Sequence, residues 1–162
     1  MIFSFKYERS IDPKQRLPIP ADIREGLDPE VDGEAFYIIE GPNGALWLWP
    51  ERTFQRLAGD IEPSLAPSWE LMDFDEITFP EARRLKFDSA GRIRIPQEML
   101  DRAGIGTRVV ILGMRNHLEL RDPEDWERRR QEKAARRAEI VQRARPAVRD
   151  RGRGGADVTG GS

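Results

Sequence analysis

The chain has 162 residues, a formal net charge of −2 at neutral pH and no cysteine. Its length allows one ordinary domain or two small ones, and the lack of cysteine excludes disulfides, thiolate nucleophiles and cysteine-based metal sites. No apolar run approaches the ~20 residues of a membrane-spanning helix and the first residues lack a signal-peptide pattern, so we expect a cytoplasmic protein.

The charge is divided unevenly along the chain. Residues 1–121 hold 16 Lys and Arg against 21 Asp and Glu, whereas residues 122–162 hold 11 against 8. The body is therefore acidic and the end of the chain is basic. Any basic surface for nucleic acid on the body has to be local.

Two stretches of the chain repeat each other. Residues 12–20 (DPKQRLPIP) match residues 88–96 (DSAGRIRIP), and residues 41–54 match residues 113–126 at a slightly shorter spacing. We interpret the chain as two copies of one unit. The predicted organisation is a first repeat over 1–58, an ordered acidic connection over 59–80, a second repeat over 81–126, and a basic helix with a disordered tail over 127–162.

Each copy predicts the same short elements in the same order. Apolar and polar residues alternate over 16–19 and again over 92–95, which predicts half-buried strands. Pro20 and Pro96 follow and open a short helix in each copy. Two more strands are expected in each copy, at 36–39 and 46–49 and at 109–112 and 118–120. The expected class is mostly β, of the α+β kind.

The segments outside the copies differ from each other in character. The acidic connection contains large apolar residues, among them Trp69, Leu71, Met72 and Phe74. A solvated tether rarely carries so many, so we expect an ordered segment that packs on the repeats. Asp122 and Pro123 predict the start of one long helix, which Pro146 ends. From Arg149 onward almost nothing can be buried, and we expect disorder.

The repeated stretch places cations on an extended backbone. Side chains two residues apart share one face of a strand, so Lys14 points the same way as Arg16. Arg92 and Arg94 have the same relation. If the copies pair about a pseudo-two-fold axis, the four cations converge on one surface. Arginine can read guanine in the major groove, and either residue can bind phosphate.

Other uses of the same residues remain open at this point. The cations could simply keep a strand soluble, or pair with Asp12 and Asp88. Those two carboxylates could form a catalytic pair, although an Asp at the start of a turn more often bonds its own backbone. His117 is the only histidine, so it forms no metal site or catalytic triad.

Trp47 and Trp49 suggest a base-stacking platform, but they alternate with leucines along a predicted strand. Packing against a neighbouring subunit is the use that we favour for them.

The repeated motifs carry a family resemblance. The first motif contains Asp12, Lys14, Arg16, Pro20 and Arg24. The second contains Asp88, Gly91, Arg92 and Pro96. Together with the trailing segments LWLWPERTF and HLELRDPEDW, they resemble the MraZ family of bacterial proteins, over about residues 1–126.

The resemblance implies a fold and a function. It implies two tandem SpoVT-AbrB-like repeats that form a pseudo-two-fold, swapped-hairpin-type barrel, followed by a C-terminal helix. It also implies a ring of many subunits that binds double-stranded DNA upstream of the division and cell-wall gene cluster, at the nucleoid. No cofactor, metal, catalytic residue, membrane or small-molecule substrate is implied.

The resemblance also assigns residues to DNA contact. It implies that Lys14, Arg16 and Arg92 touch DNA, and strand geometry adds Arg94. The chain departs from the pattern at Gln15, which replaces a glycine and predicts strain if the turn needs a positive φ.

Two further departures affect the second copy. Ala90 replaces the lysine of the first copy and Leu100 replaces its Arg24, so the second copy is expected to be a weaker reader or a structural partner.

Two alternative functions stay open. One is a scaffold ring of the same fold with weak or lost DNA binding, and the other is an AbrB-like, antitoxin-type regulator. The basic end of the chain could add salt-sensitive attraction to DNA, or it could be a solvated helix.

Overall fold

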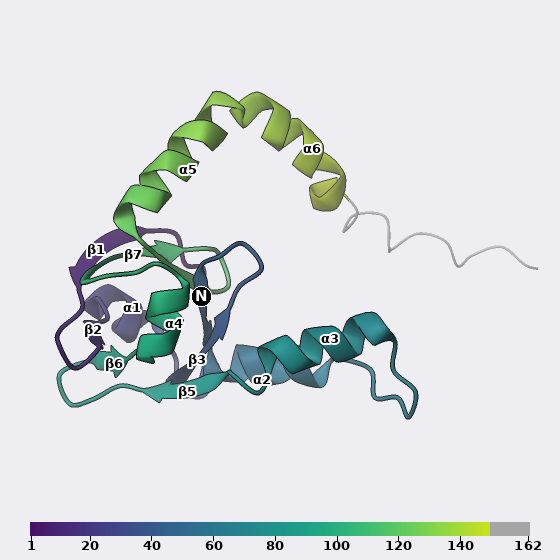
Figure 1. Cartoon of the computed structure of the whole chain (residues 1–162), viewed down its shortest axis with the longest axis horizontal. Coiled ribbons are helices and arrows are strands. Elements are labelled where there is room, and N and C mark those ends of the chain that lie inside the picture. The colour runs from purple at the N-terminus through teal and green to yellow at the C-terminus, as the bar shows by residue number, and fades with distance from the viewer. Residues whose placement is uncertain (150–162) are drawn as a thin grey trace, which may run out of the picture. The chain divides into compact units, whose positions relative to one another are not determined.

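The computed structural model describes residues 1–149, so the predicted disordered tail lies outside the described residues. The chain divides into two compact units, residues 1–123 and a second unit that begins at Glu124. The first unit holds an antiparallel six-stranded sheet and a separate two-stranded ribbon (Figure 1). In spatial order the sheet contains β1 (Lys6–Ser10), β7 (Arg108–Gly113), β8 (Leu118–Arg121), β4 (Leu46–Pro50), β3 (Ala35–Glu40) and β5 (Arg83–Lys86).

The sheet has the same order of equivalent strands from either edge. The equivalent strands of the two halves are β1 and β5, β7 and β3, and β8 and β4. The edge strand β1 pairs with β7, and the other edge strand, β5, pairs with β3. The centre of the sheet is the pair β4 and β8, in which Leu48 lies opposite Leu118. Each half of the chain therefore supplies an edge strand to the half of the sheet built by the other.

The ribbon consists of β2 (Arg16–Pro18) and β6 (Arg92–Arg94), which pair only with each other within the described residues. It lies between the two edge strands of the sheet, since β2 contacts β1 and β6 contacts β5 (Figure 1). A closed barrel was expected, and none is found in this part of the chain. The edge strands are joined through the ribbon, without a continuous hydrogen-bond ladder that would close the sheet.

The core lies between the sheet, the ribbon and two short helices, α1 (Ala21–Gly26) and α4 (Gln97–Arg102). The predicted alternation is present in the ribbon and in β4, where Leu17, Ile93, Leu46 and Leu48 are at most 1% exposed while their neighbours within each strand are less buried. Both helices follow a proline, Pro20 or Pro96, at the N-cap position. They contribute Ile23, Met99 and Leu100 to the core.

Two helices follow β4 along the chain, α2 (Glu51–Gly59) at the end of the first repeat and α3 (Trp69–Thr78) in the connection. Ser68 caps α3, because its hydroxyl accepts a hydrogen bond from the N–H of Leu71 at 3.2 Å. Aromatic rings of Phe54 and Phe79 meet edge to face at 6.1 Å, and Phe74 meets Phe79 at the same distance. The acidic connection is thus a helix held to α2 by aromatic contacts.

The second unit contains α5 (Pro123–Ala135), apart from its first residue, and α6 (Arg137–Arg149). The prediction of one helix that ends at Pro146 is wrong. The helix breaks at Arg136, whose N–H bonds the carbonyl of Lys133 at 3.1 Å in a tightened turn, and Pro146 lies inside α6. No described helix has the length and apolar character needed to cross a membrane.

Candidate nucleic-acid interface

Both repeated stretches form the same turn ahead of the ribbon. Asp12 Oδ1 accepts hydrogen bonds from the backbone N–H groups of Lys14 and Arg16, both at 2.9 Å. Asp88 Oδ1 accepts the two equivalent bonds in the second turn, also at 2.9 Å. These carboxylates therefore hold their own backbone, as Asp commonly does at a turn.

Gln15 and Gly91 occupy equivalent turn positions with positive φ angles of 59° and 74°. A left-handed backbone favours glycine because it has no Cβ to clash with the next carbonyl. Gln15 is therefore strained at the position where the strain was predicted.

Gly91 has a second constraint, which comes from Arg24. A Cβ at Gly91 would lie 2.5 Å from the guanidinium carbon of Arg24. The Nε of Arg24 donates to the carbonyl of Ile19 at 3.0 Å, which holds the side chain in place. Arg24 of the first copy thus lies across the turn of the second, and its role in this structure is to join the two copies.

The ribbon buries one side and exposes the other. Its middle residues, Leu17 and Ile93, lie opposite each other and are 0% and 1% exposed. Because side chains alternate along a strand, the residues on either side of them project outward. The outward face carries three of the four predicted cations, Arg16, Arg92 and Arg94. Lys14 is exposed in the adjoining turn.

Backbone hydrogen bonds lengthen the ribbon reciprocally. The N–H of Ile95 donates to the carbonyl of Gln15 at 2.9 Å, and the N–H of Ile19 donates to the carbonyl of Gly91 at 3.1 Å. Each turn is therefore bonded to the strand end of the other copy. The cation-bearing face is held by the backbone of both copies.

Two of the ribbon arginines are paired with carboxylates. Arg16 Nε donates to Asp12 Oδ2 at 2.6 Å, and Arg92 Nε donates to Asp88 Oδ2 at 2.8 Å. The expected alternative of pairing with these aspartates thus occurs for these two arginines. The pairs fix each guanidinium against its turn while its remaining N–H groups stay available as donors.

Lys14 and Arg94 differ from the paired arginines, because neither makes an ion pair with any residue that the structure describes. Arg94 also lies directly opposite Arg16, a like-charge arrangement that destabilises a strand pair. The outward face therefore has unneutralised positive charge at Lys14 and Arg94. Phosphate oxygens would neutralise it.

Hydrogen bonds hold the turn carboxylates ionised. The backbone N–H of Arg16, followed by its side chain, lowers the pKa of Asp12 below its usual value. The N–H and side chain of Arg92 lower the pKa of Asp88 in the same way. Both turns therefore keep their shape and their charge at neutral pH.

A buried polar cluster lies away from the ribbon and was missed by sequence reasoning. His117 stacks on the rings of Trp47 and Trp49, at 4.2 and 4.6 Å between centroids. His117 Nε2 lies 2.9 Å from Glu119 Oε2, and the other carboxylate oxygen accepts from Asn43 at 2.9 Å. The five residues come from both copies, and no local pattern in the sequence signals their meeting.

Burial and hydrogen bonding oppose each other at the Glu119 carboxylate. Burial raises the pKa of Glu119, but the hydrogen bonds with His117 and Asn43 together lower it by more, so the pKa lies below the usual value. The two tryptophan rings thus stack on a histidine of the same chain, and that histidine is hydrogen-bonded to the Glu119 carboxylate. In the described residues there is no group of three or more His, Asp or Glu placed to hold a metal ion.

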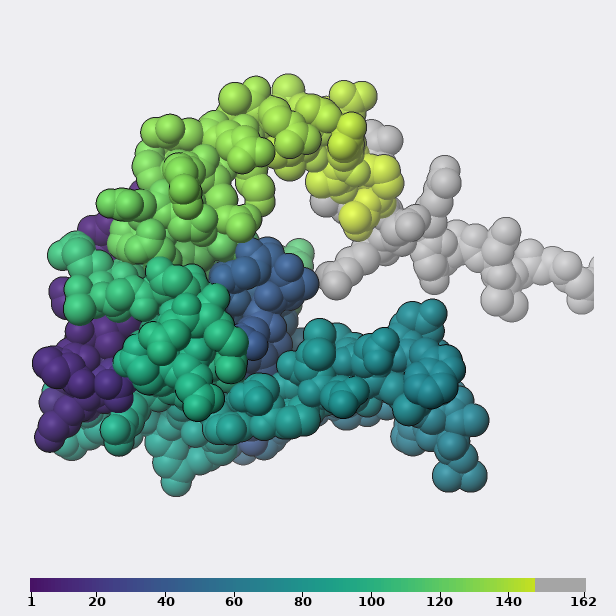
Figure 2. All heavy atoms as spheres, viewed as in Figure 1, coloured from purple at the N-terminus to yellow at the C-terminus, as the bar shows by residue number. Residues whose placement is uncertain are grey.

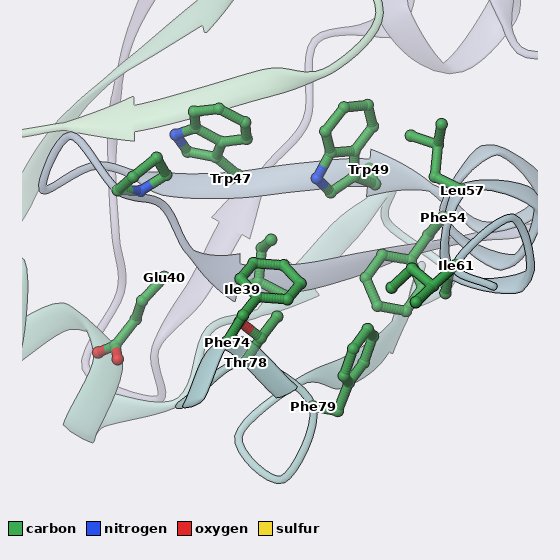
Figure 3. Close-up of a pocket in the computed structure, with 12 residues that line it drawn as sticks. Ile39, Glu40, Trp47, Trp49, Phe54, Leu57, Ile61, Phe74, Thr78 and Phe79 are labelled. Carbon is green, nitrogen blue, oxygen red and sulfur yellow. The ribbon is translucent and has the colours of Figure 1, made fainter. Parts of the chain in front are cut away.

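The tryptophans also border an apolar pocket of about 270 Å³ between β4, α2 and α3. Figure 3 shows Trp47 and Trp49 side by side along one strand, with Phe54, Phe74 and Phe79 on the other side of the pocket. Phe74 and Thr78 line this pocket, so they lie on the side of α3 that faces the sheet and α2.

Comparison with known proteins finds one family name in both the family model and the relatives. The family model described as "MraZ protein, putative antitoxin-like" matches residues 78–146. The match reaches well beyond residue 126, where the resemblance was expected to end. Thus α5 and most of α6 lie within the matched region.

Curated relatives cover most of the chain. The Transcriptional regulator MraZ of Roseiflexus castenholzii is 32% identical over 126 residues, which are 78% of this chain and 85% of the relative. The proteins of the same name from Thermomicrobium roseum and Heliobacterium modesticaldum are 30% and 29% identical over 142 residues. Each alignment covers 88% of this chain and 96% of the relative.

Proposed function

Since this chain belongs to the MraZ family, we propose that it is a transcriptional regulator that binds double-stranded DNA through the β2–β6 ribbon. The observation that carries the proposal is the outward ribbon face, where Arg94 and the nearby Lys14 have no carboxylate partner in the described structure. The relatives are named as regulators, and the chain is not an enzyme.

The ribbon has the form needed to read the major groove. That groove admits a two-stranded β-ribbon, and arginine reads guanine there through two hydrogen bonds. In this reading Arg16 and Arg92 read bases, since their aspartates hold each guanidinium in a defined orientation. Lys14 and Arg94 bind phosphates and set the register of the ribbon on the duplex.

The finer architecture is part of the proposal. We interpret residues 1–58 and 81–126 as two SpoVT-AbrB-like repeats, joined by the connection 59–80 and followed by the basic segment 127–162. The symmetric strand order of the sheet and the reciprocal bonds between Gln15 and Ile95 and between Ile19 and Gly91 support a pseudo-two-fold, swapped arrangement.

The proposed target is the promoter region of the division and cell-wall gene cluster, bound as repeated elements by a ring of subunits in the cytoplasm, at the nucleoid. The family resemblance supports this target. A ring multiplies modest affinities, because once one protomer is bound its neighbours meet the next element at a high effective concentration. Elements would recur near ~10 bp or a multiple, so that successive protomers meet the same side of the duplex.

The testing experiment titrates the purified protein against DNA from upstream of its own gene and against scrambled DNA, at two salt concentrations. We expect tighter binding to the upstream DNA that persists at the higher salt. A double variant, Lys14→Ala with Arg94→Ala, should weaken binding to both DNAs and reduce the slope of log affinity against log salt by about 2.

The matched control is Arg56→Ala, which removes an exposed arginine of α2 without an ion pair in the described structure. This variant should bind like the parent. If the parent binds neither DNA, the result would contradict the regulator and favour the alternative function, a scaffold ring of the same fold. Equal binding to both DNAs that disappears at high salt would contradict sequence reading.

A further inference from the structure

Helix α3 has an outer face that no other described residue of the first unit covers. Five residues at helical spacing form it, and we call them the α3 outer face: Trp69, Met72, Asp73, Glu76 and Ile77. The side chains of Trp69 and Ile77 are 77% and 71% exposed, and that of Met72 is 42% exposed. The spacing i, i+3, i+4, i+7, i+8 places all five on one side of the helix.

The opposite side of α3 is already used. Thr78 is buried, and Leu71 and Asp75 are partly buried. Phe74 and Thr78 line the apolar pocket under the helix (Figure 3). The orientation of α3 on the sheet is therefore fixed, and its apolar outer face is held toward the surroundings. Figures 1 and 2 show this helix projecting from the sheet.

The α3 outer face also carries two carboxylates, Asp73 and Glu76, within an acidic segment of the chain. Six carboxylates and no Lys or Arg occur between residues 60 and 79. The carboxylates of Asp73 and Glu76 make no ion pair with any residue in the described range. A patch that combines exposed large apolar groups with unpaired acid marks an interaction surface for a basic, partly apolar partner.

The second unit of the chain has the complementary chemistry. A cavity of about 550 Å³ lies on the inner side of the bend between α5 and α6, and we call its lining the basic elbow. The lining residues are Trp126, Arg130, Lys133, Ala134, Arg137, Ile140 and Val141. Ile140 and Val141 are 37% and 50% exposed.

The cations of the basic elbow are only partly neutralised. Arg130 pairs with Glu127 at 2.7 Å. Lys133 and Arg137 make no ion pair within the part of the chain that the structure describes. The break at Arg136 gives the elbow its bend, and the bend supplies the concave side.

We propose that the α3 outer face of one chain docks into the basic elbow of a second copy of the same chain. The apolar groups Trp69, Met72 and Ile77 would cover the apolar floor of the elbow, and Asp73 and Glu76 would face Lys133 and Arg137. This inference rests on the proposed assembly of many subunits and names the surfaces that build it.

Charge and apolar complementarity favour this occupant over DNA. A phosphate backbone would pair with the cations of the elbow but would leave Ile140 and Val141 without an apolar partner, whereas a helix carrying both acid and apolar side chains satisfies both. The two surfaces belong to different parts of the chain, so the contact is head to tail. Such contacts produce rings when the rotation closes and filaments when it does not.

The test uses the full chain and two charge-reversed variants, one on each surface. The first variant is Asp73→Lys with Glu76→Lys, and the second is Lys133→Glu with Arg137→Glu. Each places like charges across the proposed contact, so each alone should fall to the monomer mass of 18.6 kDa in light scattering, while the parent is a multiple of it. Mixed in equal amounts, the two variants should assemble again in alternation. The α3 outer face of the first variant then meets the elbow of the second with both signs reversed, and the α3 outer face of the second meets the elbow of the first with both signs unaltered.

A matched control reverses two carboxylates of the first repeat, Glu25→Lys with Glu30→Lys, and should assemble like the parent. Rescue on mixing also excludes misfolding as the cause of lost assembly, since unfolded chains would not complement each other. Single variants that keep the parental mass, or monomeric variants without rescue, would overturn the inference.

DNA binding separates this inference from the proposed function. A parent that is itself monomeric but retains its upstream DNA leaves the ribbon proposal standing and overturns the docking. An elbow variant that assembles normally but loses DNA affinity assigns the elbow to DNA and likewise overturns the docking. Monomeric single variants that still bind a single DNA element, together with rescue on mixing, support both.

Discussion

The turn at residues 12–16 and the turn at residues 88–92 share one backbone pattern and differ in their side chains. Both are closed by an aspartate that accepts two N–H bonds, and both place a residue at positive φ. The first turn has Lys14 where the second has Ala90, and the second strand has Arg94 where the first has Pro18.

This difference teaches that the scaffold of the site is symmetric and its charge is not. Each copy contributes two cations. The first copy places Lys14 in the turn and Arg16 on the strand, whereas the second places both Arg92 and Arg94 on the strand. Because the cations of the two copies occupy different positions on the antiparallel ribbon, the face is not two-fold symmetric, and we expect it to prefer one of the two orientations on an asymmetric DNA element.

The largest expected effect is the loss of Arg16. Arg16→Ala removes one proposed base contact while the hydrogen bonds from the turn backbone to Asp12 remain, so the fold and assembly should persist. A lost bidentate base contact costs about 1–3 kcal/mol of discrimination in each protomer, and because the proposed ring repeats the loss at every bound element, specific binding to the upstream DNA should be abolished. Competition against scrambled DNA measures this, and Arg56→Ala is the control. An Arg16→Ala variant that binds the upstream DNA as tightly and as selectively as the parent would contradict the assignment of Arg16 to a base contact.

The next prediction exchanges the residues at positive φ. Gly91→Gln makes the second turn resemble the first, and it should lower the free energy of unfolding by about 1–2 kcal/mol, because a left-handed residue with a Cβ is strained. The added Cβ also meets Arg24. Gln15→Gly should have the opposite sign and a smaller size, since glycine loses more backbone entropy on folding. Urea unfolding of both variants checks the signs, and a stabilising Gly91→Gln would contradict the prediction.

Acid should weaken both turns. A carboxylate with a lowered folded pKa contributes stability at pH values above its unfolded pKa of about 3.9, and that contribution is lost as pH falls toward the folded pKa. Asp12→Asn or Asp88→Asn removes this contribution. The difference in free energy of unfolding between the parent and each variant, called here the stability gap, should therefore decrease below about pH 4. The gap should be wider for Asp12, because Arg92 Nη1 also lies 4.0 Å from its carboxylate. Urea titrations across the acid range measure both gaps.

Asp60→Asn is the control for the acid experiment, since that carboxylate makes no side-chain hydrogen bond in the described structure. Its stability gap to the parent should show no such narrowing. A gap for Asp88→Asn that stays constant down the acid range would show that the turn bonds are not linked to ionisation.

The smallest expected effect comes from making the second turn as basic as the first. Ala90→Lys adds one cation beside the ribbon face, so binding to any duplex should tighten and the salt slope should grow by about 1. Preference for the upstream DNA should change little, since a phosphate contact carries no sequence information. Titrations at two salt concentrations test this, and an unchanged slope would place residue 90 away from the DNA.

Much of the fold could be predicted from the sequence because the repeated stretches mark their strands by alternating apolar residues. The strands β2, β4, β6 and β8 follow that pattern, β3 and β7 were predicted from short continuous apolar runs, and the two short helices follow their prolines. The edge strands were not predicted, since β1 and β5 are mostly polar and half exposed. A signal did exist for β1, because Phe3, Phe5 and Tyr7 alternate and their rings pack in series.

The rest depends on contacts between distant residues. No glycine or proline marks the break at Arg136, so the bend between α5 and α6 has no local signal. The stacking of His117 on Trp47 and Trp49 joins strands of different copies. Arg24 was recognised as a motif residue, but its place over Gly91 follows from the pairing of the two turns.

The pairing of β1 with β7 has a consequence for how the protein is made. Lys6 pairs with Leu112, so the first strand leaves the ribosome long before its partner exists. The first repeat cannot fold ahead of the second, and residues 1–123 have to fold together late in synthesis, which is slow for such distant contacts. In that interval β1 is an unpaired strand, and its Lys6, Glu8 and Arg9 protect the nascent chain from joining strands of other chains.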